Sequence, residues 1–161
     1  LKDNLYKFVF LFLILLKIFY LLNFFSLTPY HYVYVNIFGG KYSENSKKFE
    51  NDYWGVSTKK LISYISEHEE MFKNYKVKIA VCGLPVKAQN FYLKKIKNFK
   101  FEMVDKNERF DFMIMNNRAF WDEKNITYDP KKAHTCFQKF SGEDFIILKR
   151  RGLVLSKIIK I

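Results

Sequence analysis

The chain begins with a continuous apolar run and then changes to short, alternating apolar and polar stretches. From residue 5 to residue 25 the run reads LYKFVFLFLILLKIFYLLNFF, interrupted only by two lysines and an asparagine. At 1.5 Å per residue, such a run can cross the hydrocarbon core of a bilayer as a helix. The residues that follow lack the small-residue pattern of a signal-peptide cleavage site. We therefore predict a retained transmembrane helix over residues 1–27.

The next segment is aromatic and then polar. Residues 28–56 carry tyrosines where the chain would leave the membrane, a Gly39-Gly40 turn and a polar loop. Aromatic side chains of this kind are enriched at membrane–water interfaces. We interpret 28–56 as a membrane-exit segment and 57–161 as an extramembrane domain.

Within 57–161 the pattern alternates between helical and extended periods. Apolar residues at three- and four-residue steps predict a helix that Ser57 caps and that ends near Asn74. His68 falls on the apolar stripe of this helix, so we interpret it as a packed structural histidine. Further segments are predicted as a strand over 76–82, a helix over 86–98, and strands over 101–104 and 110–115. This order is typical of an α/β sandwich with a partly parallel sheet.

The C-terminal region reads as two extended segments and a tail. Residues 135–140 and 144–149 are predicted to form a hairpin across Ser141-Gly142-Glu143. The tail, Lys149-Arg150-Arg151 followed by the apolar residues 153–161, contains further lysines but no acidic residue. It could touch anionic headgroups or form a final strand of the sheet, and the sequence leaves both alternatives open.

The formal net charge is +12, and most of it lies after residue 30. A basic domain favours an anionic partner such as lipid headgroups or a phosphorylated substrate. No RNA-type aromatic motif accompanies the charge, so we expect no nucleic-acid partner. The two cysteines, Cys82 and Cys136, have no metal-binding spacing. They could form a disulfide outside the cytoplasm, but we favour two free buried thiols.

Candidate catalytic chemistry is sparse. The three histidines have no motif context, and Gly83 stands alone after its strand, where a dinucleotide site needs G-x-G-x-x-G. Glu50 and Asp52 are the exception, because they lie in an aromatic cluster and would share one face of an extended chain. They could hold a divalent cation or act as acid and base. Surface hydrogen bonding is the interpretation we favour, and no cofactor is expected.

Two stretches resemble the signatures of a known family. Residues 28–36, TPYHYVYVN, resemble an HPYQYVYFN signature, and residues 49–57, FENDYWGVS, resemble FExDYWGxS. Both are similar to the C-terminal end of multi-spanning, GT-C type membrane glycosyltransferases, a group that includes dolichyl-phosphate-mannose–protein mannosyltransferases and lipid A aminoarabinose transferases. The resemblance implies substrate-binding roles for the following motif positions: His31, Tyr34, Asn36, Glu50, Asp52, Tyr53 and Trp54.

The resemblance also implies an activity. Such enzymes transfer a sugar from a polyprenyl-phosphate donor to a lipid, glycan or protein acceptor, with the catalytic acid in an N-terminal part. We therefore expect this chain, which starts at Leu1 rather than Met, to be a C-terminal fragment that is inactive alone. Its expected partners are membrane lipid, the donor and upstream transmembrane helices, one of which would pack against Lys17.

The lysines near the start of the helix predict the side of the membrane on which the domain lies. Lys2 and Lys7 precede or open the apolar run and favour a cytoplasmic start, which puts the domain on the periplasmic or lumenal side. The alternative to the glycosyltransferase is a single-pass, membrane-anchored binding domain without catalysis.

Overall fold

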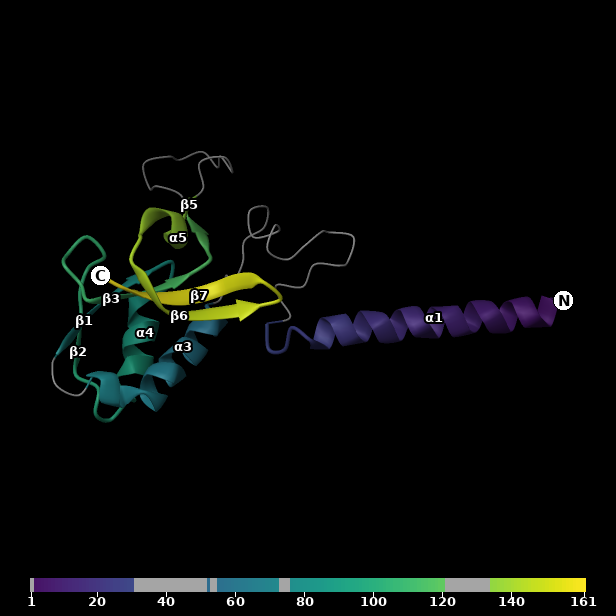
Figure 1. Ribbon diagram of the computed structural model, residues 1–161, viewed down its shortest axis with the longest axis horizontal. Helices are drawn as coiled ribbons and strands as arrows, with labels where there is room; N and C mark the ends of the chain where they lie inside the picture. The colour runs from purple at the N-terminus through teal and green to yellow at the C-terminus, as the bar shows by residue number, and fades with distance from the viewer. Residues whose placement is uncertain (1, 31–51, 53–54, 73–75, 121–133) are drawn as a thin grey trace.

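The computed structural model of the protein describes residues 2–30, 52, 55–72, 76–120 and 134–161. Its N-terminal helix, α1 (Lys2–Phe25), projects from the rest of the chain as a rod (Figure 1). All side chains from Asn4 to Leu22 are exposed. Over Asn4–Phe25 the helix is long enough and apolar enough to span a membrane. Length, composition and exposure together support the predicted transmembrane helix.

The remaining described residues fold into an α/β domain. Its helices are α3 (Val56–Glu67), the 3₁₀ turn η3 (Glu69–Phe72), α4 (Val86–Leu93) and α5 (Cys136–Lys139). Its strands are β1 (Val77–Cys82), β2 (Phe101–Met103), β3 (Phe112–Asn116), β4 (Ala119–Phe120), β5 (His134–Thr135), β6 (Glu143–Arg150) and β7 (Leu153–Lys160).

Five strands form one mixed sheet in the order β2-β1-β3-β7-β6, and β4 pairs with β5 separately. β1 runs parallel to both β2 and β3, whereas β7 is antiparallel to β3 and β6. The register places Ile114 of β3 opposite Val81 of β1 on one side and opposite Ile158 of β7 on the other. The predicted α/β domain with a partly parallel sheet is confirmed.

Both faces of the sheet are covered, so β3 is buried along its whole length. On one face, α3 inserts Leu61, Ile62 and Ile65 against β-strand residues that include Ile114 and Ile158. On the other face, Cys136 of α5 packs with a smaller cluster from the alternate strand positions. This explains why β1 and β3 are apolar except for Lys78 in β1 and Asn116 at the end of β3, as is typical of strands in a covered parallel sheet.

Two predicted helices end earlier than their apolar patterns suggest. The helix at 56–67 is capped by Gly55 rather than by Ser57, whose side chain is buried, and it gives way to η3 after His68. His68 stacks on Tyr64 with ring centroids 4.0 Å apart, which agrees with a structural histidine. α4 stops at Leu93 instead of continuing to 98, because Ile96 and Phe99 reach the core from turns.

The predicted hairpin of 135–140 with 144–149 is wrong. The Thr135 hydroxyl and the Gln138 side chain form a capping box, which turns residues 136–139 into α5. β6 instead pairs with β7 through a turn at Arg151-Gly152. Residues 153–160 thus form a sheet strand between β3 and β6, which is one of the two predicted alternatives for the tail.

Candidate functional site

The carboxyl ends of β1 and β3 meet at one edge of the sheet. Cys82 of β1 lies opposite Met115 of β3, and the two strands end within one residue of this pair. The strands that follow β1 along the chain, β2 and β3, lie on opposite sides of it. In open α/β sheets, ligand sites lie outside the carboxyl ends of strands where the strand order reverses in this way. This edge is therefore the natural place to look for a site.

Asp52 is anchored at this edge. It is fully buried, and its carboxylate accepts hydrogen bonds from the Ser57 hydroxyl and, at 3.4 Å, from the Ser57 backbone N–H. The Asp52 carbonyl oxygen accepts from Gly55 N–H at 2.8 Å and from the Asn116 side-chain amide at 3.0 Å. A residue just before α3 is thereby joined to the end of β3, and the motif residues on both sides of 53–54 are fixed in place.

Two glycines make room for this arrangement. Gly83, just after β1, has φ +77°, and a Cβ there would come within 2.2 Å of Asn116 Oδ1 and 3.0 Å of Cys136 Sγ. Gly55 has φ +62°, and its Cβ would lie 2.3 Å from a methyl group of Leu84. Any larger residue would combine left-handed backbone strain with a steric clash.

A disulfide joins Cys82 to Cys136, with the Cα atoms 5.8 Å apart. Both residues are buried, and the bond fixes α5 over the end of β1. The expectation of two free thiols is therefore wrong. The cysteines are 54 positions apart in the sequence, and their proximity could not be predicted because only the folding of α5 over the sheet creates it.

Two buried polar atoms on neighbouring strands have no hydrogen-bond partner among the residues that the structure describes. They are Asn116 Oδ1 and Ser156 Oγ, and these residues are opposite each other in the β3–β7 register. Asn116 uses its amide nitrogen for Asp52, so its oxygen packs against Gly83 instead. These contacts fix the backbone of residue 52 against the end of β3, and the Asp52 carboxylate is engaged by Ser57.

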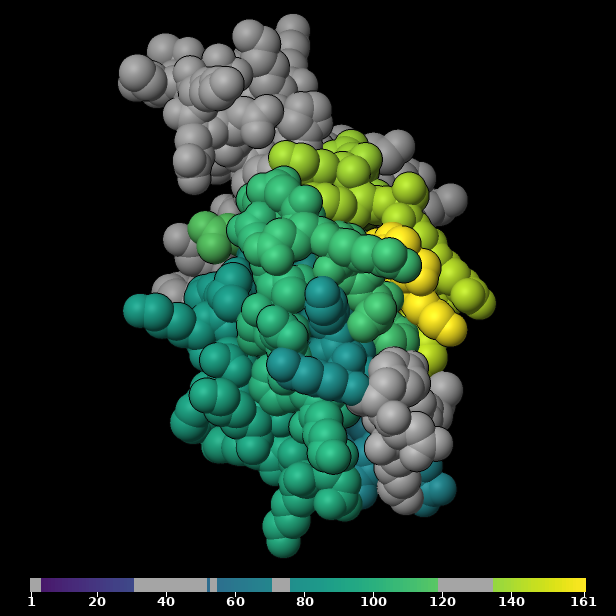
Figure 2. Space-filling model, turned by 90° about the vertical axis from the view of Figure 1, so that its left-hand side faces the viewer, coloured from purple at the N-terminus to yellow at the C-terminus, as the bar shows by residue number. Residues whose placement is uncertain are grey.

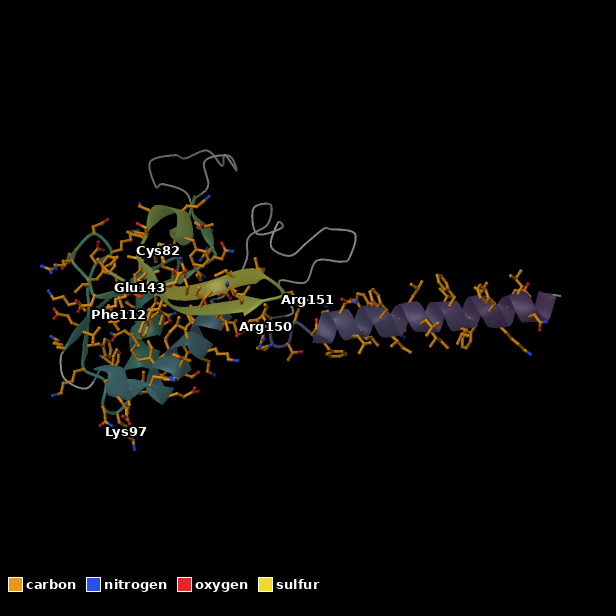
Figure 3. All side chains as sticks on the ribbon, viewed as in Figure 1. Cys82, Lys97, Phe112, Glu143, Arg150 and Arg151 are labelled. Atoms are coloured by element: carbon orange, nitrogen blue, oxygen red, sulfur yellow. A yellow bond between two sulfur atoms is a disulfide. The ribbon has the colours of Figure 1, made fainter. Side chains whose placement is uncertain are left out.

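The membrane exit docks next to Asp52. Leu27 and Tyr30, which follow α1, are buried against Leu153 and Leu155 of β7. The guanidinium of Arg150 lies 5.6 Å from the centroid of the Tyr30 ring. The end of the apolar helix and the tip of the β6–β7 hairpin are therefore in contact, as Figure 3 shows.

The pKa of Tyr30 depends on burial and on the charges of Arg150 and Asp52. Burial raises the pKa of Tyr30 above its ordinary value of 10.0, the Arg150 charge lowers it, and the Asp52 charge raises it. The hydroxyl is thus protonated at neutral pH. The sequence placed Tyr30 in the aromatic membrane-exit segment and Arg150 in the basic tail, but it predicted neither as a site residue.

Of the seven sequence-predicted site residues, the structure describes Asp52. Its φ of +47° contradicts the extended chain assumed for Glu50 and Asp52, and its burial contradicts surface hydrogen bonding. The other six lie outside the described residues, so their substrate-binding roles stay predictions: His31, Tyr34, Asn36, Glu50, Tyr53 and Trp54.

Within the described ranges, no group of three His, Cys, Asp or Glu side chains is arranged to hold a metal ion. Because Glu50 lies outside those ranges, the proposed cation at Glu50 and Asp52 stays a prediction. No family model, curated protein or solved structure matches the chain. What the fold defines is a class: a mixed α/β domain joined to a helix that can span a membrane.

Proposed function

We propose that the chain is the C-terminal part of a GT-C type membrane glycosyltransferase, in which the α/β domain caps a transmembrane bundle. The observation that carries the proposal is the position of one described residue from each family-like stretch in the folded domain. Tyr30, from the first stretch, packs with Leu155 of β7. Asp52, from the second, is hydrogen-bonded to Asn116 of β3, which lies opposite Ser156 of β7. Both Tyr30 and Asp52 are buried. Residues from two motifs that are separate in sequence thus pack against the neighbouring strands β7 and β3.

A charged residue in α1 supports the proposal that this helix packs in a transmembrane bundle. Lys17 lies near the middle of α1 among exposed apolar side chains. A charged residue at such a position is costly in lipid and normally faces other helices or an aqueous cavity. In the proposed enzyme, upstream transmembrane helices surround this face of α1.

The disulfide supports a location of the domain on the periplasmic or lumenal side of the membrane. Cys82–Cys136 would persist in an oxidising compartment and is atypical of a reducing cytosol. A periplasmic or lumenal domain also fits the lysines at the start of α1. The proposed reaction, sugar transfer from a polyprenyl-phosphate donor to a lipid, glycan or protein acceptor, takes place on that side.

In the proposed enzyme the domain positions the chain, and the resemblance assigns the catalytic acid to the N-terminal part. The hydrogen bond from Ser57 to the Asp52 carboxylate is consistent with a structural role for Asp52. The domain fixes the chain at Tyr30 and again at Asp52 and Gly55. It thereby holds both ends of the segment that contains the remaining motif positions.

The test uses the complete gene product in membranes. Its open reading frame is expected to encode further transmembrane segments and an acidic residue in the first extramembrane loop. Those membranes should transfer a labelled sugar from a polyprenyl-phosphate donor, and changing that acid to its amide should abolish transfer. The 161-residue chain expressed alone should show no transfer.

Two outcomes separate this proposal from its alternative. A gene product with a single span and no transfer would leave a membrane-anchored binding domain without catalysis. Transfer by the 161-residue chain alone would contradict the assignment of the catalytic acid to another part.

A further inference from the structure

The tip of the β6–β7 hairpin is an arginine-glycine turn with unusual backbone geometry. Arg150 pairs with Leu153, so the loop is the two residues Arg151 and Gly152, with φ values of +48° and +79°. Two-residue turns with two positive φ angles normally use Asn-Gly or Asp-Gly. An arginine held in the left-handed region is uncommon, and such outliers concentrate at functional positions.

The end of α1 fixes the depth of this tip. Arg151 Nη1 donates a hydrogen bond to Asn23 Oδ1 at 2.8 Å. Asn23 lies two residues before the end of α1, about 3 Å along the helix axis. Tyr20 and Phe24, whose rings stack with centroids 6.2 Å apart, mark the same level with aromatic side chains typical of an interface. With α1 across a bilayer, Arg151 therefore lies at the level of the lipid headgroups.

The neighbouring residues add charge at this level. Lys149 is exposed, and half-buried Arg150 leans on the Tyr30 ring with its Nε lacking a hydrogen-bond partner among the described residues. No aspartate or glutamate occurs from 145 to the end of the sequence. Three consecutive cations thus lie at the tip of the hairpin, and Arg151 joins this tip to the end of α1.

We propose that Lys149, Arg150 and Arg151 bind the phosphate of an anionic membrane lipid next to the end of α1. Guanidinium groups bind phosphate through paired N–H donors, and anionic headgroups are the phosphates available at this depth. Phosphatidylglycerol, with one net negative charge, is the simplest lipid that meets the requirement. The proposal needs α1 to lie in a membrane but does not depend on glycosyl transfer.

The experiment measures lipid binding to the full chain in uncharged detergent micelles by native mass spectrometry. Phosphatidylglycerol is titrated against wild type and the double variant Arg150→Gln/Arg151→Gln. At about fivefold per basic residue, the double variant should bind about thirtyfold more weakly. Raising the ionic strength should weaken wild-type binding, as expected for partly exposed charges.

Three control variants separate phosphate binding from structural effects. Lys97→Gln/Lys100→Gln removes the same charge from the connection between α4 and β2 and should bind like wild type. Lys97 lies at the edge of the domain away from α1 (Figure 3), and Figure 2 shows the domain from the side opposite α1. Asn23→Ala breaks the contact with Arg151 but keeps the charge, and should retain affinity within about threefold. Arg150→Lys/Arg151→Lys should lose less than the glutamine variant, because charge is kept while paired donors are lost.

Several results would overturn the proposal. These are equal affinity for phosphatidylglycerol and zwitterionic phosphatidylcholine, unchanged binding in the double glutamine variant, or an equal loss in Asn23→Ala or the Lys97/Lys100 control. Displacement of the lipid by equimolar inorganic phosphate would identify a free-phosphate site instead. Binding of polyprenyl phosphate but not phosphatidylglycerol would also overturn it, while leaving the proposed glycosyltransferase intact.

Discussion

α1 and β3 are both apolar segments, yet they meet opposite surroundings. The side chains of α1 from Asn4 to Leu22 are exposed, whereas all five residues of β3 are buried. A helix satisfies its own backbone hydrogen bonds and can present apolar side chains to lipid, whereas a strand needs neighbours on both sides. α1 is therefore suited to a bilayer by local structure alone, and β3 is stabilised by strands distant in sequence.

The end of α1 contacts the domain at the β6–β7 hairpin, through one polar and one apolar set of residues. Asn23 accepts a hydrogen bond from Arg151 and donates one to the Phe19 carbonyl oxygen of its own helix. Leu27 and Tyr30 then enter the core beside β7. Because these contacts are few, we expect that mutations can change the free energy of unfolding of the domain without changing the helicity of α1.

The largest expected effect comes from the disulfide, which lies wholly in the domain. Cys82→Ala/Cys136→Ala should lower the free energy of unfolding of the domain by about 4 kcal/mol, because the unfolded chain gains the freedom of the opened loop. Urea titration of the full chain in micelles, followed by near-ultraviolet circular dichroism, measures this. The α1 contribution to helicity should persist after the domain unfolds. An unchanged urea midpoint would show that the bond contributes nothing.

A matched pair of truncations tests the comparison directly. Ile114→Ala in β3 should cost about 3 kcal/mol in domain stability, because it leaves a cavity in a core covered on both faces. Leu13→Ala in α1, whose side chain is 56% exposed, should change the same quantity by less than about 0.5 kcal/mol. Both values come from urea titrations in micelles. Equal costs at the two positions would mean that α1 and the domain unfold as one unit.

Gly83→Ala probes the junction between β1 and Asn116. The left-handed φ and the 2.2 Å approach to Asn116 Oδ1 should together cost about 2 kcal/mol. Gly142→Ala is a useful counterpart, since that glycine has no positive φ but its Cβ would lie 2.6 Å from the Lys160 carbonyl oxygen. Thermal unfolding of the full chain ranks the two, and full stability of Gly83→Ala would exclude a strained position there.

The smallest effect concerns Tyr30 at the junction itself. Because its pKa is raised in the folded state, its contribution is complete below pH 10 and declines as the pH rises further, where the unfolded tyrosine ionises first. Tyr30→Phe should change stability at pH 7 by about 1 kcal/mol at most. The stability advantage of wild type over this variant should shrink as the pH rises above 10 in urea titrations. An advantage that grows with pH would reverse the assigned direction.

Several elements could be predicted because their signals are local. The apolar run of α1, the stripe of Leu61 and Ile65 in α3, and the apolar strand 77–82 each carry their own periodicity. The hairpin was misplaced because the capping box at Thr135 and Gln138 competes with an extended pattern. Its true turn, Arg151-Gly152, lacks the usual Asn or Asp, so no clear turn signal marks that position.

The candidate site was less predictable. Asp52 was selected for its aromatic context, but its burial and its bond to Asn116 depend on a strand 64 residues further along the chain. Arg150 and Tyr30 were not selected, since their contact exists only when the hairpin reaches the end of α1.

By itself, the sequence determined a helix that can span a membrane and an α/β domain beyond it, because hydrophobic periodicity acts over a few neighbouring residues. Tertiary structure alone decided the disulfide, the Asp52–Asn116 junction and the placement of Arg151 beside Asn23. These contacts join residues that lie 54, 64 and 128 positions apart. Their cost in chain entropy is met only by the cooperative packing of the whole sheet, which no short stretch of sequence encodes.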